Sequence, residues 1–240
     1  MKYKDLFIDF DDTLYDTHGN AVIALRELFD ALHLERWFPD PNVFYDCYWE
    51  TNIDLWTRYS KGEITRDYLI VERYRRPLTA SELYRAEANS SLSTVHFSLK
   101  MSDLFLDFCS SKPGLVDGAR QLMDYLRGKG YRLHMCSNGF HEVQYKKLRA
   151  CGLHDHFDTI VLSEDAGANK PSPLFFDYAL RQTRADKAAT LMIGDNFQTD
   201  ILGAKRYGLD TAYFNRYPEY PAAEPVTFEI TALSQLMEIL

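Results

Sequence analysis

Five short, largely apolar runs constrain the fold of this chain more than any other feature of its sequence. They occupy residues 6–8, 131–136, 159–162, 190–193 and 211–214. Each run is followed at once by a polar residue or a glycine. Runs of this kind are typical of strands that are buried on both faces of a parallel sheet. The sequence therefore predicts a parallel β-sheet.

Helical stretches lie between the apolar runs. They are expected over residues 117–129, 142–151, 173–183 and 198–206. In the first of them, Ala119, Leu122 and Leu126 fall on one face of a helix, and glycines follow at its end. The alternation of strands and helices predicts an α/β fold with a doubly wound parallel-sheet core of the Rossmann-like type.

Residues 17–110 have a different character, because they show helical periodicity and no convincing strand. Val22, Leu25 and Phe29 recur at helical spacing, and much of the aromatic content of the chain falls in this segment. We therefore expect a helical bundle inserted after the first strand. The α/β core would then consist of residues 1–16 and 111–240.

Charge and hydropathy exclude several classes of function. The 27 lysines and arginines stand against 35 acidic residues, giving a net charge of −8, so a nucleic acid polymer is not expected as a partner. No run of about 18 apolar residues predicts a membrane span. The first apolar stretch is too short for a secretory signal. The four cysteines lack metal-ligand spacing, and together these features favour a cytoplasmic protein.

Polar side chains gather where the predicted strands end. Residues 9–13 (DFDDT) follow the first run, residues 137–139 (SNG) follow the second, and Lys170 lies in the loop after the third. Gly194 and Asp195 follow the fourth run, with Asp200 five residues beyond Asp195. The carboxyl ends of parallel strands form one edge of the sheet, where ligands bind in such folds. We call it the carboxyl edge, and expect these residues to meet there.

The residue types at this edge suit phosphoryl transfer. Crowded carboxylates repel one another unless a cation neutralises them, and hard oxygen ligands without cysteine or histidine suit Mg²⁺. One carboxylate can attack phosphorus to form an aspartyl-phosphate. A second can protonate the leaving oxygen and then deprotonate the attacking water. Lys170 and Ser137 would hold the phosphoryl oxygens.

Taken one at a time, these motifs are weak signals, but all four occur in order and each follows a predicted strand. In this arrangement they resemble the four motifs of the haloacid dehalogenase (HAD) superfamily. The resemblance covers nearly the whole chain. The helical segment lies where subfamily I members carry an inserted helical cap.

The resemblance implies a role for each motif residue. Asp9 would be the nucleophile and a Mg²⁺ ligand. Asp11 would be the general acid and base, and its backbone carbonyl would also bind the metal. Asp195 would be the third protein ligand of Mg²⁺. Asp200 would support the site without binding the metal directly.

The remaining motif residues would order the site and bind phosphate. By the same resemblance, Thr13 orders the first loop, and Ser137 and Lys170 bind the phosphoryl group. Asn138 is a further candidate for the phosphate site, although a simple turn would explain it equally well.

Asp11 favours phosphate-ester hydrolysis, because dehalogenases of this type lack the second acidic residue. The expected partner is a small phosphorylated metabolite. Residues 52–56, with Tyr59, Gly62 and Arg73, are similar to caps of pyrimidine 5′-nucleotidase-type phosphatases, which points to nucleoside 5′-monophosphates. A sugar-phosphate phosphatase or a phosphomutase would use the same core. A catalytically silent phospho-ligand binding or signalling module is the alternative from another class.

The bundle also contains residues with simpler interpretations. Trp49, Trp56 and Tyr59 lie at helical spacing, which favours packing inside the bundle over contact with a substrate. Residues 73–76 include three arginines, and such a charge run usually marks a solvated face of a helix.

Overall fold

The computed structural model describes residues 2–88, 91–217 and 222–240. The chain divides into two compact units. Met1–His18 and Pro113–Leu240 form the first, and Gly19–Lys112 form the second. None of the helices in the described ranges has the length and apolar character that crossing a membrane requires.

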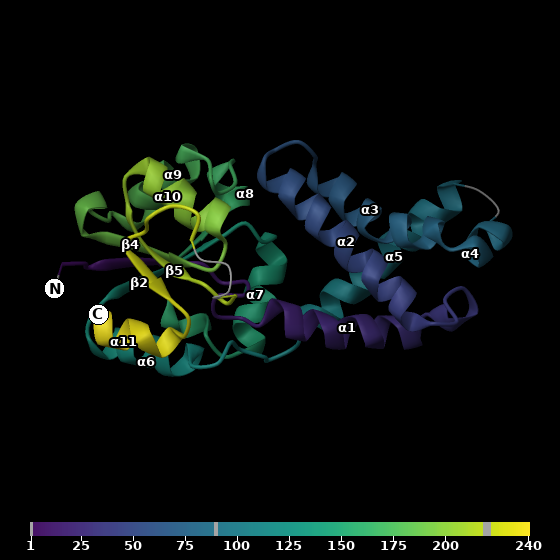
Figure 1. Ribbon diagram of the computed structural model, residues 1–240, viewed down its shortest axis with the longest axis horizontal. Coiled ribbons are helices and arrows are strands. Elements are labelled where there is room, and N and C mark those ends of the chain that lie inside the picture. Colours follow the sequence, from purple (N-terminus) through teal and green to yellow (C-terminus); the bar gives the residue numbers. More distant parts are fainter. Residues whose placement is uncertain (1, 89–90, 218–221) are drawn as a thin grey trace. The chain divides into compact units, whose positions relative to one another are not determined.

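A six-stranded sheet organises the first unit, with the order β3-β2-β1-β4-β5-β6 and every neighbouring pair parallel (Figure 1). Its strands are β1 (Asp5–Ile8), β2 (Arg132–Ser137), β3 (Thr159–Leu162), β4 (Thr190–Gly194), β5 (Asp210–Phe214) and β6 (Phe228–Ile230). The predicted doubly wound parallel sheet is confirmed. The first strand in the sequence lies in the middle of the sheet, between β2 and β4.

Both faces of the sheet are covered by side chains, as the apolar runs predict. Leu6 and Ile8 belong to one hydrophobic cluster, while Phe7 belongs to another, because successive side chains of a strand point to opposite faces. The helices of this unit are α6 (Ala119–Gly128), α7 (His141–Ala150), α8 (Ser163–Ala166), α9 (Pro173–Thr183), α10 (Gly203–Tyr207) and α11 (Leu236–Ile239).

Two features of this unit differ from the sequence prediction. The sixth strand was not predicted, because its three residues alternate in burial at the edge of the sheet and contain an exposed Glu229. The expected helix over 198–206 is divided into a π-helical turn, η4 (Phe197–Leu202), and α10. Asn196 begins η4 by accepting hydrogen bonds from the backbone N–H groups of Gln198 and Thr199.

The second unit contains helices joined by short turns, with no strand among its described residues. Its elements are α1 (Thr17–Ala31), the 3₁₀ turn η1 (Leu34–Arg36), α2 (Pro41–Ser60), α3 (Arg66–Ala80), α4 (Glu82–Glu87) and α5 (Ser91–Ser110). Side-chain oxygens of Asp40, Thr65 and Ser81 cap the starts of α2, α3 and α4. A hydrophobic cluster of its own, with Leu28 and Tyr48 fully buried, fills the interior of this unit.

The solvated face predicted for the three arginines is wrong for Arg73. Only 3% of this residue is exposed, and its guanidinium carbon lies 5.3 Å from the ring centroids of Tyr74 and Phe105. Leu69, Arg73 and Pro77 recur every four residues on the buried face of α3, which carries Arg73 inward.

Candidate active site

The carboxyl edge of the sheet brings the motif residues to the same level. Ile8 at the end of β1 is aligned with Met135 of β2 and Ile193 of β4. The residues that follow these positions therefore leave the sheet side by side. Asp9 follows Ile8 directly, and Asp195 follows the last residue of β4.

Lys170 lies at the centre of this edge and is almost completely buried. Its Nζ is 2.6 Å from Asp9 Oδ1 and 2.8 Å from Asp200 Oδ1, and it donates a hydrogen bond to the carbonyl oxygen of Cys136. Burial alone would lower the pKa of Lys170, but the carboxylates of Asp200 and Asp9 outweigh it and raise that pKa. The lysine therefore stays positively charged.

Asn138 fixes the loop that carries this lysine. Its side-chain Nδ2 donates to the carbonyl oxygen of Lys170, and its Oδ1 accepts from the backbone N–H of Lys170. The structure thus gives the Asn138 amide an anchoring contact, in addition to its predicted place beside the phosphate. Ser137, also buried, accepts a hydrogen bond from the backbone N–H of Gly139.

Thr13 joins the first and last motif loops. Its Oγ1 lies 3.1 Å from Asp9 Oδ2 and 3.0 Å from Asp195 Oδ1, and it accepts a hydrogen bond from the backbone N–H of Asp195. One hydroxyl therefore holds two carboxylates that are 186 positions apart in the sequence in a common geometry.

Three carboxylates form a candidate metal centre. Ligand atoms of Asp9, Asp195 and Asp200 all lie within 4.8 Å of one another. Burial raises the pKa of Asp9 to about 7 and the pKa of Asp195 well above its usual range, and the neighbouring carboxylates add to both shifts. An all-carboxylate set with this repulsion fits a hard divalent cation such as Mg²⁺.

Asp200 reaches this cluster because β4 ends in glycine. A Cβ atom added at Gly194 would clash with the carboxylate of Asp200, so a larger residue would displace it. The backbone N–H of Asn196 and the hydroxyl of Thr199 donate to the same carboxylate. The resemblance implies a supporting role for Asp200 without direct metal binding. In the structure its carboxylate forms an ion pair with Lys170 and also belongs to the cluster of three carboxylates.

Asp11 points to a different set of partners. Its carboxylate forms an ion pair with Lys147, accepts a hydrogen bond from Gln144 Nε2, and accepts another from Thr17 Oγ1 at 2.6 Å. Burial alone would raise the pKa of Asp11, but Lys147, with help from Thr17 and Gln144, holds it below its usual value. The side chain of Asp11 is thus not among the three clustered carboxylates.

Gln144 and Lys147, which contact Asp11, were not predicted as site residues from the sequence. Both belong to the buried face of α7, between Val143 and Leu148. Polar residues at core-facing positions of an amphipathic helix are the signal that could have found them, because such positions are usually apolar.

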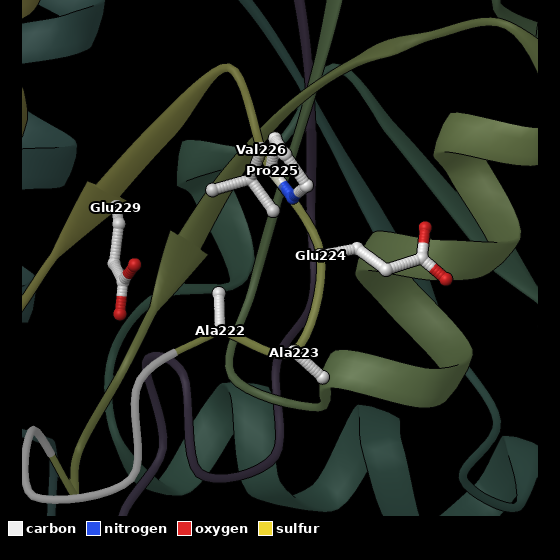
Figure 2. A pocket seen from close by; sticks show the side chains of 6 residues that line it. All are labelled: Ala222, Ala223, Glu224, Pro225, Val226 and Glu229. Carbon is white, nitrogen blue, oxygen red and sulfur yellow. The ribbon is translucent and has the colours of Figure 1, made fainter.

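A separate hollow of about 380 Å³ lies where the chain approaches β6 (Figure 2). It is lined by Ala222, Ala223, Glu224, Pro225, Val226 and Glu229. None of the predicted site residues contributes to its lining, so the carboxyl edge remains the candidate active site.

Comparison with known proteins shows the family to which the chain belongs. The sequence model of the haloacid dehalogenase-like hydrolases matches residues 3–208. The chain belongs to this family. The resemblance seen in the sequence is thereby confirmed, and the chain is an enzyme of the hydrolase class.

Relatives of this HAD-like hydrolase match it over nearly its whole length. The pyrimidine 5′-nucleotidase YjjG of Escherichia coli (strain K12) is 30% identical, and the match covers 100% of this chain and 99% of that protein. A glyceraldehyde 3-phosphate phosphatase of Methanothermobacter thermautotrophicus is 29% identical over 99% of both chains.

A solved structure shows the same fold as this HAD-like chain. It is that of the HAD-hydrolase YfnB of Bacillus subtilis, described as bound to magnesium, with a TM-score of 0.85 and 29% identity. The superposition covers 100% of this chain and 99% of YfnB. The sequence comparison with YfnB gives 33% identity over 100% of this chain and 96% of that protein.

Proposed function

We propose that this protein is a phosphate monoester hydrolase with Asp9 as its nucleophile. The observation that carries the proposal is the burial of the Asp9 carboxylate against Lys170, with Asp11 two residues farther along. The first gives a nucleophile beside a fixed positive charge. The second gives a carboxyl group for proton transfer, which favours an ester over a carbon–halogen substrate.

The reaction has two displacements at phosphorus. In the first, a carboxylate oxygen of Asp9 bonds to phosphorus, the bond from phosphorus to the ester oxygen breaks, and the leaving alcohol takes a proton from the carboxyl group of Asp11. Because Lys147 holds Asp11 ionised in the free protein, Asp11 must take up this proton when the ester binds. In the second, Asp11 accepts a proton from water, the water oxygen bonds to phosphorus, and the aspartyl-phosphate bond breaks. Inorganic phosphate leaves and Asp9 is regenerated. Lys170 offsets negative charge on the phosphoryl oxygens in both steps.

Mg²⁺ is the cofactor that we propose. Asp9 and Asp195 would hold it, together with the backbone carbonyl of Asp11, and Asp200 would support the site through Lys170. When bound, the cation would stabilise charge on the transferring phosphoryl group. The crowding of the three carboxylates and the magnesium bound in the YfnB structure support this assignment.

We propose nucleoside 5′-monophosphates, with a preference for pyrimidines, as the substrates. The name of the E. coli relative supports this choice, as does the similarity of residues 52–56, with Tyr59, Gly62 and Arg73, to nucleotidase caps. We assign substrate selection to the helical unit, Gly19–Lys112, acting as a cap. The archaeal phosphatase relative supports a second candidate class, the sugar phosphates.

Phosphate release from a panel of monoesters tests these proposals. The panel contains pyrimidine and purine 5′-monophosphates and sugar phosphates, each assayed with Mg²⁺ and with a chelator. We expect Mg²⁺-dependent release, fastest from a pyrimidine nucleotide, and none from the Asp9→Asn variant. Release from sugar phosphates alone would select the second class. A folded protein that releases phosphate from no ester would contradict the proposal.

A further inference from the structure

The carboxylate of Asp11 is bound by side chains that have no role in the proposed reaction steps. Lys147 and Thr17 contact its Oδ1, and Gln144 contacts its Oδ2. We propose that Lys147 and Gln144 are positioning residues that fix the carboxylate of Asp11 for proton transfer. The inference rests on the proposed function, in which Asp11 acts as the general acid and base.

Lys147 is a buried lysine whose ammonium group pairs with the Asp11 carboxylate. Only 6% of the residue is exposed, and its Nζ lies 5.0 Å from the ring centroid of Tyr15, which is fully buried. A lysine is rarely buried to this extent unless its charge is paired. Asp11 supplies that pairing, so burial of the ammonium group fixes the position of the carboxylate.

Gln144 also serves Asp11, because only one end of its side-chain amide has a hydrogen-bond partner among the described residues. Its Nε2 donates to Asp11, whereas its Oε1 is buried with no hydrogen-bond partner within the described part of the chain. An unsatisfied buried acceptor is destabilising, and an apolar residue of similar size would avoid it. What the amide provides at this position is its N–H donor to Asp11.

The glycine of the Ser-Asn-Gly motif makes room for this contact. A Cβ atom added at Gly139 would clash with the Nε2 of Gln144. The strand end that supplies Ser137 to the site therefore also admits the side chain that holds Asp11. Lys147 follows Gln144 by three residues, so both project from the same face of α7.

A fixed general acid matters most when the leaving group is poor. A good leaving group, such as p-nitrophenolate, departs with little protonation, whereas an alkoxide needs a proton in the transition state. Loss of positioning should therefore slow hydrolysis of alkyl phosphates and spare p-nitrophenyl phosphate. A purely structural role would slow both substrates equally.

The test compares kcat/KM for p-nitrophenyl phosphate and for the best alkyl phosphate of the panel, in wild type and Lys147→Met. We expect a loss of about 10²-fold for the alkyl ester and less than about threefold for the nitrophenyl ester, in line with the contribution of general acid catalysis. Lys147→Arg, which retains the charge, should recover most of the lost activity. Lys146→Met removes an exposed lysine from the same helix and is the matched control.

Equal losses on the two substrates would overturn the inference. If circular dichroism shows that Lys147→Met does not fold, Gln144→Met takes its place. We expect Gln144→Met to lose more kcat/KM on the alkyl ester than on the nitrophenyl ester, and equal losses on the two esters would overturn the inference. A folded wild type that hydrolyses neither ester overturns the proposed function and the inference with it. An active wild type with uniform losses in the variants overturns the inference alone.

Discussion

At the carboxyl end of β1, Asp9 shares a buried site with Asp195 and Asp200, whose ligand atoms lie within 4.8 Å of one another. A single ammonium group, that of Lys170, contacts Asp9 and Asp200. Burial and mutual repulsion raise the pKa values of Asp9 and Asp195. Burying these mutually repelling carboxylates lowers the stability of the fold, and such an arrangement is typical of a site that serves a reaction.

Replacement of Asp9, the proposed nucleophile, is the first prediction at this scale. Asp9→Asn should lower kcat by several orders of magnitude, because the amide cannot form the phosphoryl-enzyme. The melting temperature should not fall, since one buried negative charge is removed from a crowded site. Asp12→Asn is the matched control, because Asp12 has a φ of 62°, a backbone conformation that asparagine also adopts. Wild-type turnover in Asp9→Asn would contradict the covalent mechanism.

Cation binding gives a second prediction. Mg²⁺ should raise the melting temperature of the wild type, because a ligand that binds only the folded state stabilises it in proportion to RT ln(1 + [Mg²⁺]/Kd). Asp195→Asn removes one of the proposed charged ligands, so the melting temperature of this variant should rise far less at the same Mg²⁺ concentration. Thermal melts followed by circular dichroism measure both. Equal shifts in the two proteins would place the cation elsewhere.

At the scale of elements, the pairing of β1 with β2 brings the buried Asp5 beside His134 and Arg132, away from the candidate active site. His134 Nε2 lies 3.0 Å from Asp5 Oδ1, and Arg132 contacts the same carboxylate. Burial lowers the pKa of His134 below its ordinary value of 6.5, against the opposing effect of Asp5. The folded protein therefore keeps this imidazole neutral in a range where the unfolded chain is protonated.

The pH dependence follows from that difference. Below about 6.5 the unfolded chain binds the proton more readily, so His134 should reduce the free energy of unfolding as the pH falls from there through its folded-state pKa. Urea unfolding between about pH 8 and pH 5 measures this loss. His134→Gln should show a smaller decrease than wild type. Identical pH profiles for the two proteins would exclude His134 as the cause.

The helices of the second unit depend on their own apolar interior. Leu28 of α1 is fully buried in the hydrophobic cluster of that unit. Leu28→Ala should lower the free energy of unfolding by about 2–5 kcal/mol, because a cavity replaces packed side-chain atoms. Ile23 lies on the same helix and is 49% exposed, so Ile23→Ala should cost much less. Chemical denaturation measures both changes, and similar losses would contradict the burial assigned to Leu28.

At the scale of the whole molecule, each hydrophobic cluster lies within one of the two units. Two clusters contain only residues of the first unit, and the third contains only residues between Ala21 and Cys109. Each unit therefore has the core that independent folding requires. The backbone N–H of Asp16 donates to the carbonyl oxygen of Gly114, so the two connections leave the first unit side by side.

Removal of the insert tests this independence. A chain in which a short glycine linker joins His18 to Pro113 should unfold cooperatively and keep the Mg²⁺-dependent rise in melting temperature, because the clustered carboxylates all belong to the first unit. Selectivity among phosphate esters should be lost, since we assign it to the insert. A chain that fails to fold would show that the first unit depends on the second.

The sequence by itself determined the elements and the residue types of the site. Short apolar runs marked five of the six strands, because a doubly buried strand must be apolar along most of its length. Periodic apolar residues marked the helical insert, because a packed helix buries one face and exposes the other. The motif residues were found because parallel strands bring their carboxyl ends to one edge.

Only the tertiary structure decided which carboxylate has which partner. Asp200 joins Asp9 through Lys170, and Asp11 is turned toward Lys147, 136 positions away. These contacts depend on strand order, on the path of α7 and on the space left at Gly139 and Gly194. Local sequence patterns report burial and periodicity along one segment, whereas such contacts join segments that only packing of the folded chain brings together.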